Sequence, residues 1–197
     1  QLDKKQQVKE ILRCGKDPSY FLTTYARISH PMHGLILFNT YDFQDDLLKD
    51  FNDYRFNVIL KARQLGLSTL TAGYSLWMMT FHQDKNILVI ATKQETAKNL
   101  VAKVRVMHNE LPSWLKNKCV EDNKLSLKYE NGSQIKAVSS NSDSARSESL
   151  SLLIIDEAAF IDKIDSIWTA AQQTLSTGGG CIALSTPNGV GLSLIHI

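Results

Sequence analysis

The chain has 197 residues, of which 43% are hydrophobic, and its formal net charge is +2. This length suggests one domain with room for a small appendage, and the small net charge excludes a protein that is basic overall, so any nucleic-acid contact must be local. No apolar run approaches the ~18 residues needed to cross a membrane, and three scattered cysteines without a CxxC pair indicate neither a disulfide framework nor a zinc site and fit a reducing compartment.

The first part of the chain predicts two short helices and a strand. Within residues 4–13, apolar side chains recur at helical spacing, which indicates an amphipathic helix. Asp17-Pro18 is typical of a helix start, and Pro31 and Gly34 are expected to interrupt the second helix. Residues 35–38 are apolar and predict a strand.

Residues 39–44 lead into a further predicted helix and contain two aromatic rings next to an amide. Before a nucleotide-binding loop, such a group can clamp an adenine: Tyr41 or Phe43 would stack on the base and Gln44 would contact its edge. In the alternative interpretation, the two rings belong to the core and Gln44 belongs to the surface.

The segment after residue 56 has the strand, turn and helix that a phosphate-binding loop requires. Asn57 and the apolar residues 58–60 lead into a short polar turn, and a helix-compatible segment, residues 68–81, follows. Backbone N–H groups at the start of such a helix point at an anion, and the helix dipole favours it. The alternative is a polar turn before a core helix.

The loop matches part of the pattern G-x-x-x-x-G-K-[ST], and its lysine stands at a different position. Gly66 takes the second glycine and Ser68 takes the hydroxyl that binds Mg²⁺, but Lys61 stands at the first glycine and Leu67 stands at the lysine. Lys61 is long enough to reach back over a short loop to the β- and γ-phosphates. Arg63 is a second candidate for this contact.

The middle of the chain predicts a buried strand and an amphipathic helix. Residues 87–91 are all apolar, as inside a parallel sheet. The helix predicted over residues 92–110 turns five apolar side chains inward: Ala97, Leu100, Val101, Val104 and Met107. Its basic residues predict a solvated face, or alternatively a DNA contact: Lys93, Lys98, Lys103 and Arg105.

Alternating segments around Asn131-Gly132 predict a β-hairpin with a type I′ turn. The serine-rich residues 139–149 predict a loop. This loop contains Arg146, which is either solvated or placed to serve a phosphate.

The apolar run 152–155 predicts a buried strand that ends in two carboxylates. In nucleotide hydrolases, an aspartate at a strand end holds Mg²⁺ and the following glutamate polarises the attacking water, which are the roles predicted for Asp156 and Glu157. The alternative is a solvated acidic turn.

The last part of the chain predicts a helix over residues 161–175 and an apolar strand over residues 181–184. The polar run 185–189 follows that strand. Ligands bind at the carboxyl edge of open α/β sheets, so this run is expected near the phosphate loop. Ordinary turn residues are the alternative.

Four of these segments, in this order, resemble motifs of the large terminase subunits of tailed phages, the DNA-packaging motors. Lys61-Ala-Arg-Gln-Leu-Gly-Leu-Ser-Thr69 resembles their deviant Walker A motif, and Ile154-Ile-Asp-Glu157 resembles their Walker B motif with its catalytic glutamate. Ser185-Thr-Pro-Asn-Gly189 is similar to their coupling motif, and Tyr41-Asp-Phe-Gln44 is similar to their adenine-binding motif. The pattern is most similar to the T4-like branch.

The resemblance implies an α/β fold: a P-loop NTPase core of the ASCE (RecA-like) type with a mainly parallel, twisted sheet between helices, plus a small N-terminal helical subdomain. The expected boundaries are residues 1–50 for that subdomain with the adenine segment and residues 51–189 for the ATPase core. Residues 190–197 no longer match and are interpreted as a truncated or artefactual tail. The nuclease domain of full-length family members is expected to be absent.

The implied activity is hydrolysis of MgATP that drives double-stranded DNA into the procapsid. The nucleotide would be held by Tyr41, Gln44, Lys61, Arg63, Gln64, Gly66, Ser68, Thr69, Thr186 and Asn188, with Thr186 and Asn188 sensing the γ-phosphate. Ser68 and Asp156 would hold Mg²⁺, Glu157 would orient water, and Arg146 matches an arginine proposed to act on a neighbouring subunit's ATP.

The implied partners are double-stranded DNA, the portal protein, the small terminase subunit and further copies in a pentameric ring, with no membrane. The protein is expected in the host cytoplasm and transiently at the portal vertex of the procapsid, but not in the mature virion. Two alternatives stay open: a superfamily 2 helicase-like ATPase, and a nucleotide-binding module without hydrolysis. Leu67 supports the second alternative, whereas Glu157 argues against it.

Overall fold

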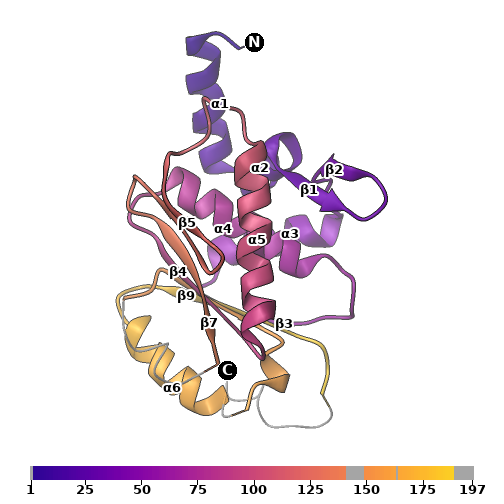
Figure 1. The fold of residues 1–197 in the computed structure, drawn as a ribbon, viewed down its shortest axis with the longest axis vertical. Helices are drawn as coiled ribbons and strands as arrows, with labels where there is room; N and C mark the ends of the chain where they lie inside the picture. The colour runs from indigo at the N-terminus through magenta and orange to yellow at the C-terminus, as the bar shows by residue number, and fades with distance from the viewer. Residues whose placement is uncertain (1, 141–148, 163, 189–197) are drawn as a thin grey trace.

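The computed structural model describes residues 2–140, 149–162 and 164–188 (Figure 1). Within this part of the chain, a seven-stranded sheet has the order β3 (Phe56–Leu60), β9 (Gly180–Ser185), β8 (Leu152–Asp156), β4 (Asn86–Ala91), β7 (Gln134–Ser139), β6 (Ser126–Tyr129) and β5 (Cys119–Asn123). The pairings from β3 to β7 are parallel and those from β7 to β5 are antiparallel.

Helices cover both faces of this sheet (Figure 1). The helices of the described residues are α1 (Lys4–Lys16), α2 (Pro18–Tyr25), α3 (Asp42–Asp53), α4 (Leu67–Phe81), α5 (Gln94–Glu110) and α6 (Ile164–Thr174), with a short 3-10 helix, η2, over Ala158–Phe160. The predicted α/β fold with a mainly parallel sheet between helices is therefore confirmed.

The parallel strands are buried on both faces because successive side chains point to opposite sides. On β4, Ile87 and Val89 contribute to the core against α4 and α5, whereas Leu88 and Ile90 contribute to the core against α6. The strands β8 and β9 divide their side chains between the two cores in the same way. This burial holds the carboxyl ends of neighbouring strands in register.

The helices that precede and cover the sheet follow the predicted pattern. All five side chains expected to point inward from α5 are buried. The helix α4 is buried around most of its circumference, because α1 and α2 contribute to the core on its outer side. The N-terminal helices therefore share the core of the sheet, and the division at residue 50 stays a prediction.

The helix α1 begins at a capping box between Asp3 and Gln6 and extends away from the rest of the molecule (Figure 1). Its predicted helical character is confirmed. The apolar side chains at helical spacing, Val8, Ile11 and Leu12, are nevertheless exposed.

The second predicted helix ends earlier than expected, and this prediction was wrong beyond Tyr25. Ala26 is extended, and its carbonyl accepts a hydrogen bond from the N–H of Phe38 at 3.0 Å. Residues 27–30 form a strand, β1 (Arg27–His30), that pairs antiparallel with β2 (Gly34–Leu37). The pairing with the predicted strand β2 is a long-range interaction that helical spacing does not reveal.

The predicted hairpin is present as β6 and β7, but its turn is not of type I′. That type needs positive φ at both central residues, and only Gly132, at 84°, has it, not Asn131. The N–H of Gly132 donates to the carbonyl of Tyr129, and the N–H of Tyr129 donates to the carbonyl of Ser133. This is a three-residue connection with glycine in the left-handed position. The strand β5 at the sheet edge was not predicted.

In the part of the chain that the structure describes, no helix combines the length and the apolar character that crossing a membrane requires.

Candidate active site

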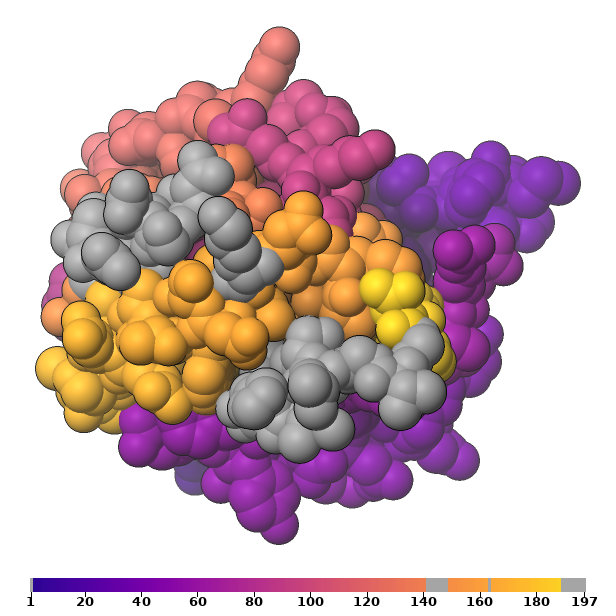
Figure 2. Space-filling model, turned by 90° about the horizontal axis from the view of Figure 1, so that it is seen from below, coloured from indigo at the N-terminus to yellow at the C-terminus, as the bar shows by residue number. Residues whose placement is uncertain are grey.

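The candidate site lies at the carboxyl edge of β3, β9 and β8, where the polar segments that follow these neighbouring parallel strands meet. The backbone N–H of Lys61, after β3, donates to the carbonyl of Ser185 at the end of β9 at 2.8 Å. The segment after β9 also lies beside the segment after β8, as the yellow and orange surfaces in Figure 2 show. Parallel pairing therefore brings together three stretches that lie far apart in the sequence.

The loop between β3 and α4 has the geometry expected of an anion-binding loop. Gln64 and Gly66 have φ angles of 63° and 71° in the left-handed region. Gly66 is the N-cap of α4, and a Cβ at this position would lie 3.0 Å from the Nε2 of Gln44, so the position favours glycine. The loop and the first turn of α4 line a hollow of about 190 Å³. N–H groups at a helix start favour an anion there.

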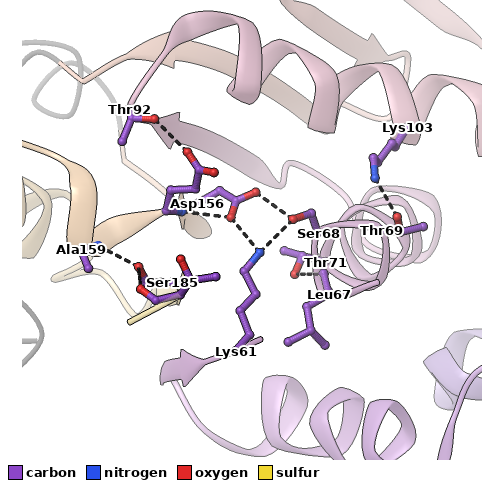
Figure 3. A network of polar contacts seen from close by, with 12 residues as sticks. Lys61, Leu67, Ser68, Thr69, Thr71, Thr92, Lys103, Asp156, Ala159 and Ser185 are labelled. Atoms are coloured by element: carbon purple, nitrogen blue, oxygen red, sulfur yellow. Dashed lines mark hydrogen bonds and ion pairs between the residues drawn. The ribbon is translucent and has the colours of Figure 1, made fainter. Parts of the chain in front are cut away.

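Lys61, Ser68 and Asp156 form a connected group at the centre of the site (Figure 3). The Lys61 Nζ lies 3.3 Å from both the Ser68 Oγ and the Asp156 Oδ1. The Ser68 hydroxyl donates to the Asp156 Oδ2 at 2.8 Å. This hydrogen bond joins the predicted phosphate loop to the end of β8, although the two residues are 88 positions apart in the sequence.

The same group fits a magnesium ion. Mg²⁺ prefers hard oxygen ligands, and the hydroxyl of Ser68 and the carboxylate of Asp156 supply them side by side. The ammonium of Lys61 already contacts both, which indicates that this position favours positive charge. The two predicted metal ligands therefore lie in direct contact with each other, and their role as a metal pair stays a prediction.

Leu67, at the usual lysine position of the loop, is buried in the core and turns away from the polar group (Figure 3). Arg63 is exposed and lines a second hollow of about 520 Å³ together with Lys61 and Glu157. The cations within reach of the loop are thus supplied from positions other than 67.

One such cation was not predicted: Lys103, from α5. We expected its side chain on a solvated helix face, and this was wrong. Its Nζ donates to the Thr69 Oγ1 at 2.8 Å, and the side chain lines the loop hollow (Figure 3). Burial lowers the pKa of Lys103, as does the nearby charge of Lys61, against the opposing effect of Asp156. Lys103 lies beside the buried face of α5, three residues after buried Leu100. Helical periodicity could therefore have indicated that its side chain is not fully solvated.

Glu157 follows β8 in a left-handed conformation, with φ of 57° and ψ of 40°. Such a backbone is uncommon for a residue other than glycine and concentrates at functional positions. Its exposed carboxylate accepts a hydrogen bond from the Thr92 hydroxyl at 3.0 Å. Thr92, directly after β4, also lines the second hollow and was not predicted as a site residue. A polar residue directly after a buried strand was the available signal.

The polar run after β9 contacts the segment that follows Glu157. The Ser185 hydroxyl accepts a hydrogen bond from the N–H of Ala159 at 3.0 Å. The Asn188 amide donates to the carbonyl of Ala159 at 3.0 Å. Thr186 lines the second hollow with Glu157. Thr186 thus lines the same hollow as the predicted catalytic carboxylate, and Asn188 bonds to the segment that follows that carboxylate.

The adenine-binding candidates have a burial pattern opposite to the alternative in which the rings are core and Gln44 is surface. Tyr41 is 67% exposed and stacks on Phe43, with the ring centroids 5.8 Å apart. Gln44 is only 2% exposed. Its Nε2 donates to the carbonyl of Leu65 at 2.9 Å, and its Oε1 accepts from the N–H of Tyr41 at 3.2 Å. Gln44 therefore holds the loop backbone directly.

Arg146, the predicted trans-acting arginine, lies outside the described residues, as does the predicted tail 190–197.

Comparisons with known proteins agree with the overall fold. The family model described as "Terminase large subunit, T4likevirus-type, N-terminal" matches residues 58–191. A mutant of the large terminase ATPase domain of Thermus phage P74-26 is similar in structure, with a TM-score of 0.63 and 22% identity, over 78% of this chain and 68% of that chain.

Two further solved structures are similar in fold. The large terminase of bacteriophage HK97 has a TM-score of 0.70 and 20% identity, over 92% of this chain and 40% of that chain. The large terminase of a thermophilic bacteriophage, solved in complex with ADP, has a TM-score of 0.59 and 14% identity, over 78% of this chain and 40% of that chain. The chain thus spans less than half the length of these two large terminases and has the RecA-like fold of terminase ATPase domains.

Proposed function

Because the chain belongs to the T4-like family of large terminase subunits, within their N-terminal part, we propose that it is the ATPase domain of a phage DNA-packaging motor. It binds MgATP and hydrolyses the bond between the β- and γ-phosphates to drive translocation of double-stranded DNA. The observation that carries this proposal is the group formed by Lys61, Ser68 and Asp156, with Glu157 directly beyond it in the adjoining hollow.

The residues divide the reaction between them. Loop N–H groups, from Gln64 to Thr69, bind the phosphates, and Lys61 with Arg63 neutralises their charge. Ser68 and Asp156 hold Mg²⁺, which when bound neutralises charge on the β- and γ-phosphate oxygens. Glu157 orients the attacking water and accepts its proton. Phosphoryl transfer depends on positioning and charge neutralisation, and these groups supply both.

Changes at the γ-phosphate can pass to the rest of the protein through the end of β9. Thr186 lines the hollow that Glu157 also lines. Asn188 and Ser185 bond to Ala159, which is two residues after Glu157 in the chain. A shift of the segment after β8 therefore moves β9, whose end is also bonded to Lys61. We propose this connection as the link between hydrolysis and movement.

For the base, we propose that Tyr41 offers an exposed ring for stacking and that Gln44 contacts the adenine edge. The stacked, exposed pair of Tyr41 and Phe43 supports the first role. The second role requires the Gln44 amide to exchange its bond to Leu65 for the base. Nucleotide binding would then remove the hydrogen bond by which Gln44 holds the loop backbone.

The proposed partners follow from the family. They are double-stranded DNA, the portal protein, the small terminase subunit and further copies of the chain in a pentameric ring. The proposed place of action is the host cytoplasm, at the portal vertex of the procapsid. Arg146 is proposed to complete a neighbouring subunit's site in this ring.

The test is Mg²⁺-dependent ATP hydrolysis by the chain and by Glu157→Gln over a range of protein concentrations. We expect turnover that requires Glu157 and rises more than linearly with concentration, because the ring brings in the neighbour's arginine. Glu130→Gln is the matched control, since Glu130 is an exposed carboxylate far along the chain from the loop. Unaltered turnover in Glu157→Gln would refute the assignment.

Two further measurements separate the alternatives: ATP binding compared with turnover, and a DNA assay that distinguishes unwinding from duplex translocation. Tight ATP binding without turnover at any concentration favours a nucleotide-binding module, for which buried Leu67 is the structural argument. DNA unwinding in place of duplex translocation favours a helicase-like ATPase. The family match over residues 58–191 supports the packaging motor against both.

A further inference from the structure

The hydroxyls of two consecutive residues at the start of α4 point to different partners. Ser68 donates to Asp156, whereas Thr69 accepts a hydrogen bond from Lys103 (Figure 3). Successive residues on a helix are turned by about 100° around its axis, so the two hydroxyls mark two sides of the helix start. One side is the predicted metal side, and the other has a cation from α5.

Lys103 is a partly buried cation bonded to a neutral group. Its hydrogen-bond partner is the hydroxyl of Thr69, and no ion pair of the described residues includes it. An ammonium taken out of water without an anion in direct contact is unfavourable, and burial lowers the pKa of this one, against the opposing effect of the nearby Asp156 charge. An anion in the loop hollow that Lys103 lines would provide the missing charge.

The position of Lys103 along a bound nucleotide follows from the metal side. Ser68 and Asp156 would hold Mg²⁺, which would neutralise charge on the β- and γ-phosphates, so these two phosphates are assigned to the side of the helix start that Ser68 faces. The remaining phosphate lies on the other side of the helix start. The α-phosphate is therefore the phosphate within reach of Lys103, which lines the loop hollow beside Thr69.

We propose that Lys103 binds the α-phosphate of the nucleotide and is a second binding cation beside Lys61. This inference rests on the proposed function, because it assigns a residue to the nucleotide of the same site. It assigns the two lysines to different phosphates. Lys61 contacts the β- and γ-phosphates, between which the bond is hydrolysed. Lys103 contacts the α-phosphate, which ATP and ADP share.

The experiment is calorimetric titration of the chain with ADP and with ATPγS in the presence of Mg²⁺. In Lys103→Ala we expect both affinities to fall about tenfold or more, by the same factor, as for loss of a hydrogen bond to a charged group. Lys103→Arg should recover most of the loss. In Lys61→Ala the loss should be larger for ATPγS than for ADP.

Lys98→Ala is the matched control, because Lys98 is on the same helix and pairs with Glu95 at the surface. It should bind both nucleotides as the unaltered chain does. Thermal unfolding without nucleotide separates a structural role: a lower unfolding temperature with unchanged affinity of Lys103→Ala would overturn the inference.

A loss confined to ATPγS would overturn it too, since the α-phosphate is common to both ligands. If the unaltered chain bound neither nucleotide, the proposed function would fail and the inference with it. If the unaltered chain binds and Lys103→Ala binds equally well, the inference alone fails.

Discussion

The ion pair between Lys61 and Asp156 provides a quantitative test of how the nucleotide-free site is held together. The two side chains are 14% and 7% exposed, and the Nζ and Oδ1 atoms are 3.3 Å apart. At this distance the attraction is about 5 kcal/mol for an effective dielectric constant of about 20, before desolvation opposes it. We expect a net coupling of about 2 kcal/mol between the two residues, because desolvation offsets a large part of the attraction.

The perturbation is a double-mutant cycle of Lys61→Met, Asp156→Asn and the double variant. The measured quantity is the free energy of unfolding from urea titrations at pH 7 without Mg²⁺ or nucleotide. Lys61→Met alone should cost about 2 kcal/mol, less than for a fully isolated carboxylate. Asp156 keeps its hydrogen bonds from the Ser68 hydroxyl and the Glu157 N–H.

The control cycle uses Lys118 and Glu130, an ion pair at 3.7 Å whose side chains are 73% and 63% exposed. Water screens this pair, so its coupling should stay below about 0.5 kcal/mol. A coupling for Lys61 and Asp156 as small as that of the control would refute the reasoning, because it would mean that the buried pair adds nothing to stability.

Three further predictions concern the surroundings of the site. Thr92→Val should lower kcat about three- to tenfold in steady-state ATPase assays, because the Thr92 hydroxyl restrains the Glu157 carboxylate. Thr92→Ser keeps the hydroxyl and should stay close to the unaltered chain, so equal rates for the two variants would contradict this prediction. Gly66→Ala should destabilise the chain by about 1–2 kcal/mol in urea unfolding and weaken ADP binding in calorimetry, because its φ is 71° and the new Cβ would crowd Gln44; unchanged stability and affinity would contradict this. Burial lowers the pKa of His108 to about 4 from 6.5, so the unfolded chain binds more protons between these values, and the free energy of unfolding should fall by up to about 3 kcal/mol as pH drops from 6.5 to 4. His108→Gln should remove that part of the pH dependence, and an identical pH profile in the variant would contradict the assignment.

Local patterns in the sequence were enough to predict most elements of the sheet and its helices. The all-apolar runs of β4 and β8 predict strands buried on both faces, and the apolar spacing of α5 identifies its inward side. The turn with Gly66 between β3 and α4 predicts the anion-binding loop. These signals are reliable because burial of one face gives each helix or strand its own spacing of apolar residues. This spacing can be read from neighbouring residues alone.

Local patterns failed where a partner far along the chain decides the conformation. The residues of β1 continue a helical segment, but pairing with β2 converts them into a strand. The strand β5 has polar and exposed residues and exists through its pairing with β6 at the sheet edge. Only one central residue of the predicted type I′ turn has positive φ, because the connection contains three residues.

For the candidate site, the sequence by itself determined which chemical groups follow the strands: the cation and hydroxyl of the loop and the carboxylates Asp156 and Glu157. Only the tertiary structure decided which groups meet. The parallel order of β3, β9 and β8 brings Ser68 to Asp156, and the packing of α5 on α4 brings Lys103 to Thr69. A side chain's periodic position tells which way it faces along its own element, but the contact it makes depends on the element packed opposite, which residue spacing does not encode.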